Sequence, residues 1–192
     1  MRENSKMITF LTEYIRHPRT TGAIAPSSRY LARKMAEQID YKRANTIIEL
    51  GPGTGVFTKE IIKRKAPDTT LVLIEINETF VKQLQSQFKD IPNVHIIHGS
   101  AEYMEGYLKE LHLPTIDVVL SGLPFTSMPE PVSTNILNRV SEVLDEDGSF
   151  ITFQYSLVKK AFIQQFFQSI KLKKVWGNLP PAYVLSCKKV GN

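Results

Sequence analysis

Residues 47–55, Ile-Ile-Glu-Leu-Gly-Pro-Gly-Thr-Gly, are the stretch that defines the fold of this 192-residue chain. The apolar start predicts a buried strand, the three alternating glycines predict a tight turn, and Thr54 predicts the start of a helix over residues 54–65. Glycine allows a ligand close to the backbone because no Cβ stands in the way. The helix points its free N–H groups and positive dipole end back at the turn.

A second apolar strand ends in a carboxylate that belongs to the same pattern. Residues 70–75, Thr-Leu-Val-Leu-Ile-Glu, place Glu75 twenty residues beyond Gly55. In nucleotide-binding α/β sheets an acid at this spacing accepts hydrogen bonds from ribose hydroxyls. We therefore expect Glu75, with Ile76 beside it, to contact an adenosine-containing cofactor.

The rest of the chain alternates in the same way. Short apolar runs separated by amphipathic stretches indicate βαβ units and a parallel sheet covered on both faces. We expect strands at residues 46–50, 70–75, 94–97, 116–121 and 149–154, and helices at 54–65, 78–88, 101–109, 131–144 and 157–169. Asp-Glu-Asp-Gly at 145–148 predicts a turn before the fifth strand. Residues 171–176 and 182–188 predict an antiparallel hairpin at the end.

Composition indicates one domain with a proper core, because 42% of the residues are apolar and 22% are charged. The single cysteine, Cys187, excludes an internal disulfide, and its place in an apolar strand favours a packed thiol. No run approaches the ~20 apolar residues that span a bilayer, and the N-terminus lacks a signal-peptide pattern. We expect a cytoplasmic protein, with peripheral attachment to the inner membrane face as a further possibility.

The net charge of +5 is unevenly placed along the chain. Residues 1–43 hold nine Lys or Arg and four Asp or Glu, whereas the remaining residues hold fifteen of each. The basic N-terminal segment favours an anionic partner, either nucleic acid or an acidic membrane surface. A solvated helical face explains the charge equally simply.

The acid before the glycines gives the pattern a family likeness. Glu-Leu-Gly-Pro-Gly-Thr-Gly resembles motif I of the class I S-adenosylmethionine-dependent methyltransferases. This resemblance implies a Rossmann-like seven-stranded sheet, with helices on both faces and a C-terminal antiparallel hairpin, and S-adenosyl-L-methionine as cofactor. It also implies that Glu49 holds the glycine turn and faces the methionine ammonium, and that Gly51, Gly53 and Gly55 lie against the cofactor. A Rossmann-like domain for another adenosine cofactor is the alternative.

The end of the third expected strand carries Ser100 and Ala101. Methyltransferases often place an aspartate here against the adenine amino group, and the hydroxyl of Ser100 could act as a weaker substitute. Ser100 is explained equally well as the N-cap of the next helix.

The end of the fourth expected strand, Ser121-Gly122-Leu123-Pro124-Phe125, predicts the turn that positions the methyl acceptor. Proline turns the chain out of the strand, so the carbonyls of Gly122 and Leu123 would face the acceptor and the Phe125 ring would form an apolar wall. The turn resembles the Asn-Leu-Pro-Tyr motif of ribosomal RNA adenine dimethylases. Gly122 replaces the asparagine that holds an adenine amino group, which argues against a nucleobase acceptor.

Ser-Gly-Leu-Pro-Phe is instead similar to the bacterial phospholipid N-methyltransferases, which are relatives of the RNA dimethylases. Residues 22–28 and 178–182 carry the same likeness. The resemblance implies that Ser27 and Ser28 lie near the methionine end of the cofactor. An N-cap before a helix at 29–38 is the other interpretation of this segment.

We divide the chain into a basic N-terminal helical segment, residues 1–44, and a cofactor-binding core, residues 45–192. The first helix carries an apolar stripe next to basic residues, which suits a bilayer interface or packing on the domain. The stripe comprises Met7, Phe10, Leu11, Tyr14 and Ile15.

The sequence predicts an amine methyltransferase without a metal and without an assigned general base. Tyr14, His98 and Tyr103 are the weak candidates for a base. The preferred acceptor is the amino head group of a phospholipid such as phosphatidylethanolamine, on an anionic membrane surface. The alternatives are an RNA adenine N6-methylase, a small-molecule amine methylase, and a non-catalytic cofactor- or RNA-binding module.

Overall fold

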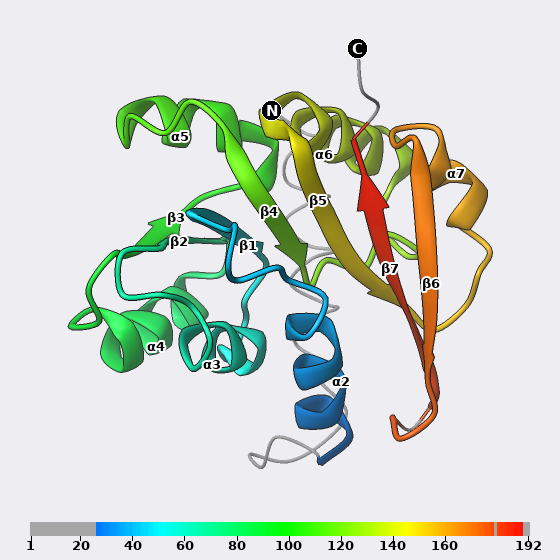
Figure 1. Ribbon diagram of the computed structural model, residues 1–192, viewed down its shortest axis with the longest axis horizontal. Coiled ribbons are helices and arrows are strands. Elements are labelled where there is room, and N and C mark those ends of the chain that lie inside the picture. Colours follow the sequence, from blue (N-terminus) through cyan, green and yellow to red (C-terminus); the bar gives the residue numbers. More distant parts are fainter. Residues whose placement is uncertain (1–25, 179, 190–192) are drawn as a thin grey trace.

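The computed structural model describes residues 26–178 and 180–189 of the chain. A single seven-stranded sheet runs through it in the order β3-β2-β1-β4-β5-β7-β6 (Figure 1). Its first five strands are parallel, and β7 pairs antiparallel with both β5 and β6. The strands are β1 (Thr46–Leu50), β2 (Thr70–Glu75), β3 (Val94–His98), β4 (Ile116–Ser121), β5 (Leu144–Gln154), β6 (Ser169–Val175) and β7 (Ala182–Lys188).

Helices cover both faces, as the continuous apolar strands require. The helices are α2 (Pro26–Ala36), α3 (Val56–Ile62), α4 (Glu78–Phe88), α5 (Met104–Glu110), α6 (Glu130–Val143) and α7 (Lys160–Gln164), with a 3₁₀ turn, η1 (Ala101–Tyr103), before α5. Successive strand residues point to opposite faces of the sheet and so belong to two core clusters. Ile48 lies in the cluster on the face covered by α5, α6 and α7, and Ile47 lies in the cluster on the face covered by α2, α3 and α4. The expected sheet, its hairpin and its two helical layers are confirmed.

Four predicted boundaries were wrong. The first core helix begins at Val56, because Gly55 at φ +79° is in the left-handed region and ends the turn. The expected helix at 157–169 shortens to α7, and β6 takes Ser169. The third helix splits into η1 and α5, and α2 begins before the expected residue 29.

The predicted turn at residues 145–148 was also wrong, because these residues lie inside β5. Ile116 pairs with Leu144 and Val118 pairs with Ser149, so the four residues form an irregularity opposite Asp117. A hydrogen-bonded ion pair from Arg43 to Asp147 (2.7 Å) ties this irregularity to the segment before β1. The chain bulges within the strand instead of leaving it.

The basic helix expected near the N-terminus lies outside the described residues. Of the described segment before β1, α2 places Leu31 and Met35 in the core cluster with α3 and β1. None of the described helices is long and apolar enough to cross a membrane. Cys187 is buried in the core, and burial raises the pKa of its thiol to about 12, as expected for a packed side chain.

Candidate active site

The candidate site lies at the carboxyl edge of the sheet, where the ends of β1, β2, β3 and β4 are joined by hydrogen bonds one residue beyond each strand. In each case the glycine that follows a strand donates its N–H to a carbonyl of the neighbouring strand. The pairs are Gly51 N to Ile74 O (3.0 Å), Gly99 N to Glu75 O (2.9 Å) and Gly122 N to Leu50 O (2.8 Å). The loops that follow therefore start from fixed positions.

The glycine turn has its three glycines in the left-handed region, Gly51 at φ +66°, Gly53 at +55° and Gly55 at +79°. A side chain is strained in such conformations. A Cβ added to Gly53 would meet nothing within 4 Å, so the middle of the turn borders open space. This is the arrangement that a ligand seated over the turn requires.

Glu75 anchors the glycine turn. Its Oε2 accepts a hydrogen bond from Gly53 N (2.9 Å), and its Oε1 accepts one from Asn77 N (2.9 Å). Burial raises the pKa of the Glu75 carboxyl, and the bonds from Asn77 and Gly53 oppose that rise. The expectation that Glu49 holds the turn was wrong, because the turn points its Gly53 N–H at β2 and not at β1.

Glu49 lies fully buried below the turn and faces α3. Its Oε2 accepts a hydrogen bond from the Thr58 hydroxyl (2.7 Å), whereas its Oε1 has no partner among the described residues. Burial raises the pKa of Glu49 to about 8, the Thr58 bond opposes the rise, and the nearby Glu75 charge adds to it. A buried carboxyl oxygen without a donor fits a site that receives a cation.

At the end of β3, Ser100 is the N-cap of η1, since its hydroxyl accepts a hydrogen bond from Glu102 N (3.3 Å). Ala101 is buried behind it. The imidazole Nε2 of His98 lies 3.1 Å from the Ile76 carbonyl oxygen, which brings the ends of β2 and β3 together. The capping interpretation of Ser100 is confirmed, and its cofactor contact stays a prediction.

The turn after β4 packs directly against the glycine turn. A Cβ on Gly122 would lie 2.8 Å from the carbonyl oxygen of Gly51, and a Cβ on Gly51 would lie 2.7 Å from the Leu123 side chain. Ser121 holds the start of this turn, because its buried hydroxyl accepts a hydrogen bond from Leu123 N (3.1 Å). The two turns therefore fit together only because Gly51 and Gly122 have no Cβ at the contact.

Part of the expected acceptor turn was wrong. The Leu123 carbonyl accepts the N–H of Phe125 (3.1 Å) but keeps a second lone pair, so its contact with the acceptor stays a prediction. The Phe125 ring is only 1% exposed and meets Phe150 edge-on at 6.0 Å between ring centroids, so it belongs to the core and forms no open wall. Pro124 redirects the chain inward at this point. Of the two expected carbonyls, that of Gly122 accepts no hydrogen bond from the described residues.

Two residues near the site were not identified from the sequence. Thr58, the partner of Glu49, lies in the first turn of α3, and its place three residues after the last glycine was the available signal. Gln154 ends β5 with its side chain 3% exposed and both amide heavy atoms without a partner among the described residues. A lone glutamine closing an apolar strand was the only sequence signal for it.

Other residues expected at the site are not among the contacts described above. Tyr103 is mostly exposed, Tyr14 lies outside the described residues, and the side chains of Ser27 and Ser28, in the first turn of α2, are outside them too. Within the described residues, no three His, Cys, Asp or Glu side chains gather as metal ligands.

The model of the family "Ribosomal RNA adenine dimethylase" matches residues 27–171. The chain is 31% identical to the ornithine lipid N-methyltransferase of Singulisphaera acidiphila over 183 residues, which cover 94% of this chain and 95% of that protein.

Other likenesses are more partial or concern the fold. Ribosomal RNA small subunit methyltransferase A of Dehalococcoides mccartyi is 38% identical over 72 residues, which cover 38% of this chain and 24% of that protein. The solved 1,6-didemethyltoxoflavin-N1-methyltransferase of Burkholderia thailandensis, which holds S-adenosylhomocysteine, superposes with a TM-score of 0.73 at 12% identity, covering 98% of this chain and 90% of that chain. This structural likeness shows a shared methyltransferase fold.

Proposed function

This chain belongs to the ribosomal RNA adenine dimethylase family, and we propose that it is an S-adenosylmethionine-dependent N-methyltransferase acting on the amino head group of a membrane lipid. The observation that carries the acceptor class is coverage. The likeness to an ornithine lipid N-methyltransferase extends over 94% of this chain and 95% of that protein. The likeness to the RNA methylase from D. mccartyi covers 24% of that protein.

The residues at the ends of β1 and β2, the cofactor half of the site, fit S-adenosylmethionine. The buried carboxyl oxygen of Glu49 that has no partner among the described residues can receive the methionine ammonium, and Gly53 borders open space for the body of the cofactor. Glu75, at the end of β2, would accept hydrogen bonds from the ribose hydroxyls. Its carboxyl oxygens already accept from Gly53 N and Asn77 N, so it would give up one of these bonds or accept both donors at the same oxygen. The proposed set of cofactor contacts also includes Gly51, Gly55, Ile76, Ser100, Ala101, Ser121, Ser27 and Ser28. Bound S-adenosylmethionine supplies an electrophilic methyl group.

The chain's own contribution to the reaction is placement. The acceptor turn, residues 122–125, is fixed against the glycine turn by the Gly122–Gly51 contact, which sets the distance between acceptor and cofactor. Holding two reactants at attack distance and orientation is worth up to about 7–11 kcal/mol. The Gly122 carbonyl, which accepts no hydrogen bond within the described part of the chain, can accept one from an acceptor amine.

Gly122 also bears on which amine is accepted. An asparagine at this position would bring its Cβ to 2.8 Å from the Gly51 carbonyl, so the present backbone has no room for the amide that would hold an adenine. A flexible alkyl amine needs no such planar support. This supports a lipid head group over a nucleobase.

A second function, RNA adenine N6-methylation, is favoured by one observation. The adenine dimethylase model matches residues 27–171 and thus includes both turns. A small-molecule amine is a third acceptor class. Attachment to the inner face of an anionic membrane goes with the first function and not with the others.

A labelling experiment separates these acceptors. Purified protein receives S-adenosylmethionine with a radiolabelled methyl group, together with liposomes containing phosphatidylethanolamine and phosphatidylglycerol, unmethylated ribosomal RNA, or phosphoethanolamine. We expect label in the lipid phase. Label in RNA or in phosphoethanolamine alone would assign the chain to one of the other classes, and failure to bind S-adenosylmethionine would reject the enzyme itself.

A further inference from the structure

The charge of the folded core is strongly divided along the chain. Residues 148–192 contain seven lysines and neither Asp nor Glu, whereas residues 44–147 contain fifteen acids and eight Lys or Arg. The balance over residues 44–192 conceals this division. The basic part comprises the end of β5, α7 and the β6–β7 hairpin.

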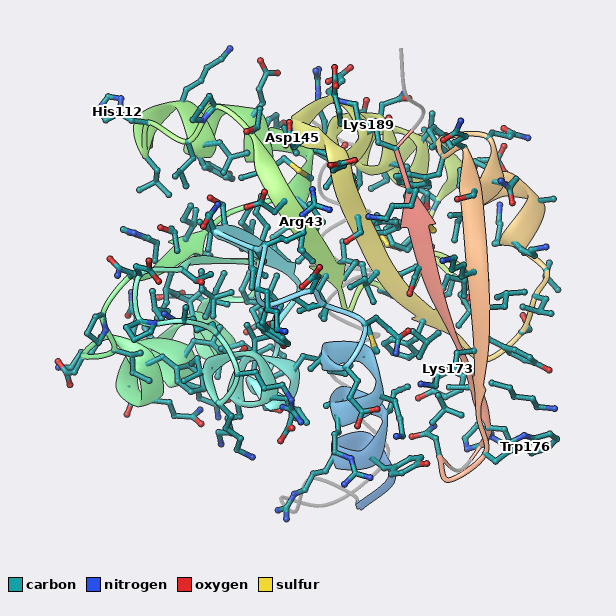
Figure 2. All side chains as sticks on the ribbon, viewed as in Figure 1. Arg43, His112, Asp145, Lys173, Trp176 and Lys189 are labelled. Carbon is teal, nitrogen blue, oxygen red and sulfur yellow. The ribbon has the colours of Figure 1, made fainter. Side chains whose placement is uncertain are left out.

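Exposed apolar and aromatic side chains gather in the same part of the chain. We define the C-terminal rim as Tyr155, Leu157, Val158, Leu172, Lys174 and Trp176. Val158 is 82% exposed and Trp176 is 72% exposed, and both are among the large apolar side chains that the fold leaves in solvent. Figure 2 shows Trp176 pointing outward at the end of the hairpin.

Strand register places two members of the rim, Tyr155 and Trp176, at the carboxyl edge of the sheet. Gln154, the last residue of β5, pairs with Tyr183, and Tyr183 pairs with Lys174 on β6. Tyr155 and Trp176 therefore follow at the same end, about two strand spacings, or ~10 Å, apart. This is the edge that also carries the acceptor turn after β4.

Lysine and aromatic side chains alternate at the hairpin end. The ammonium of Lys174 lies 3.6 Å from the centre of the Trp176 ring and 5.4 Å from that of Tyr183. Lysines on an edge strand such as β6 also discourage pairing with other chains. That role leaves Trp176 and Val158 unexplained, because exposed apolar groups at an edge favour association.

We propose that the C-terminal rim docks on the surface of an anionic lipid bilayer. Lysines attract acidic head groups, and Trp and Tyr rings settle at the interface between head groups and chains. Leu157 and Val158 can enter the apolar layer, whereas they offer no favourable contact to RNA phosphates. Docking by this edge turns the acceptor turn toward the membrane, so the inference rests on the proposed lipid substrate.

Trp176 is the only tryptophan of the chain, so its fluorescence reports on the rim alone. Wild-type protein is titrated with vesicles of phosphatidylcholine, with and without phosphatidylglycerol, and with vesicles carrying brominated acyl chains. We expect a blue shift and bromine quenching with the anionic vesicles, both weakened by salt. Co-sedimentation with vesicles without any change in emission would overturn the proposal. Quenching by ribosomal RNA with no response to vesicles would replace the bilayer by nucleic acid.

A variant pair completes the test. Lys174→Glu together with Val158→Ser should weaken partition onto anionic vesicles at least tenfold. Lys89→Glu, at the exposed end of α4 on the other side of the molecule, is the charge-matched control and should change it less than twofold. Equal effects of both variants would contradict docking by the rim. Unchanged S-adenosylmethionine affinity in both variants separates failed docking from a failed enzyme.

Gln154 supports a second proposal on a separate observation. The residue is 3% exposed, and its buried amide has no partner for either heavy atom among the described residues. A buried polar group without a partner destabilises the folded state. Two residues earlier, Thr152 donates to the Ser121 carbonyl (3.4 Å), so Gln154 stands beside the acceptor turn.

We infer that Gln154 binds the acceptor head group, with its amide oxygen accepting from the amine and its amide N–H₂ donating to a head-group oxygen. This also rests on the proposed lipid substrate. Gln154→Met removes both polar atoms at similar length. We expect a higher Tm, because the unpaired amide is gone, but at least a tenfold higher KM for the lipid with S-adenosylmethionine affinity unchanged.

The conservative Gln154→Glu keeps one acceptor oxygen and should recover part of the KM lost in Gln154→Met. An unchanged lipid KM in Gln154→Met, whatever happens to Tm, would make Gln154 structural only. Loss of S-adenosylmethionine binding in that variant would equally contradict a role confined to the acceptor.

Discussion

The two halves of the carboxyl edge are held in different ways. In the cofactor half, at the ends of β1 and β2, side-chain carboxylates bind named groups: Glu75 accepts from the backbone of Gly53, and Glu49 accepts from Thr58. In the acceptor half, at the ends of β4 and β5, shape matters most, since Gly122 fits against a carbonyl oxygen. The first half is held by hydrogen bonds to buried carboxyl groups, whereas the second combines backbone and hydroxyl hydrogen bonds with close packing of the two turns.

This difference predicts that adding even a small side chain to the acceptor half will lower activity more than any other change proposed below. Gly122→Ala places a Cβ 2.8 Å from the Gly51 carbonyl oxygen, so one of the two turns must move. Because misplacement by about 1 Å can cost on the order of 100-fold, we expect kcat/KM for the lipid to fall about 100-fold. Steady-state methylation of liposomes measures the loss.

Gly106→Ala is the control for this variant. A Cβ on Gly106, within α5, would meet nothing within 4 Å, and alanine favours a helix by up to about 1 kcal/mol. We expect normal activity and a slightly higher Tm. Comparable activity losses in the two variants would show that the contact between the turns has no special role.

The cofactor half is tested by removing charge without changing shape. Glu49→Gln keeps a partner for Thr58 but loses the carboxylate that would meet the ammonium. A charge-assisted hydrogen bond is worth about 1.5–3 kcal/mol, so we expect the Kd for S-adenosylmethionine to rise about 30-fold. Calorimetry measures it, with Glu110→Gln, exposed at the end of α5, as control. Equal affinity in Glu49→Gln and wild type would reject the ammonium contact.

Phe125 distinguishes packing from substrate contact within the acceptor half. Its ring is buried against Phe150, so Phe125→Leu should lower the free energy of unfolding by about 1–2 kcal/mol. The lipid KM should change less than twofold. Denaturant unfolding and steady-state kinetics measure the two effects. A raised KM with unchanged stability would restore Phe125 as a wall of the acceptor site.

The raised pKa of Glu49 predicts that cofactor binding releases a fraction of one proton from the protein. With a folded pKa of about 8, Glu49 is mostly protonated in the free protein at pH 7. Binding of the cofactor ammonium favours the carboxylate, so a proton should leave Glu49. Calorimetry in buffers of different ionisation enthalpy measures this release, which Glu49→Gln should abolish.

Protein stability follows from the same shift with a definite sign. Between the unfolded pKa near 4.5 and the folded pKa of about 8, the folded state holds more protons at Glu49 than the unfolded state. The contribution of Glu49 to stability is therefore lost as pH rises through this window. A contribution that grew with pH in a comparison of wild type and Glu49→Gln would contradict a raised pKa.

The parts of the fold and site that could be predicted from sequence are those that depend on neighbours close in the chain. The strand-turn-helix at residues 46–62 and the carboxylate of Glu75 follow from local spacing, because glycine conformation and strand ends depend on near neighbours. The partner of Glu49, the burial of Phe125 and the missing partners of Gln154 depend on which strands lie side by side. The spacing of Glu49 predicted a carboxylate at the site but not that it turns toward Thr58.

The bulge in β5 shows the same limit. Asp-Glu-Asp-Gly has the composition of a turn, and it stays within a strand because the flanking residues Leu144 and Ser149 both pair with β4. The division of charge after residue 147 was available in the sequence, but its meaning required the register that brings the C-terminal rim to the carboxyl edge.

The central claim is that this edge transfers methyl groups to an amino lipid. The most direct measurement is mass spectrometry of lipids and ribosomal RNA from a bacterial host without methylated amino lipids, expressing either wild type or Gly122→Ala. We expect amino lipids heavier by one or more methyl substitutions with wild type, nearly none with the variant, and unchanged adenines in both. Newly methylated RNA adenines with unchanged lipids would contradict the account.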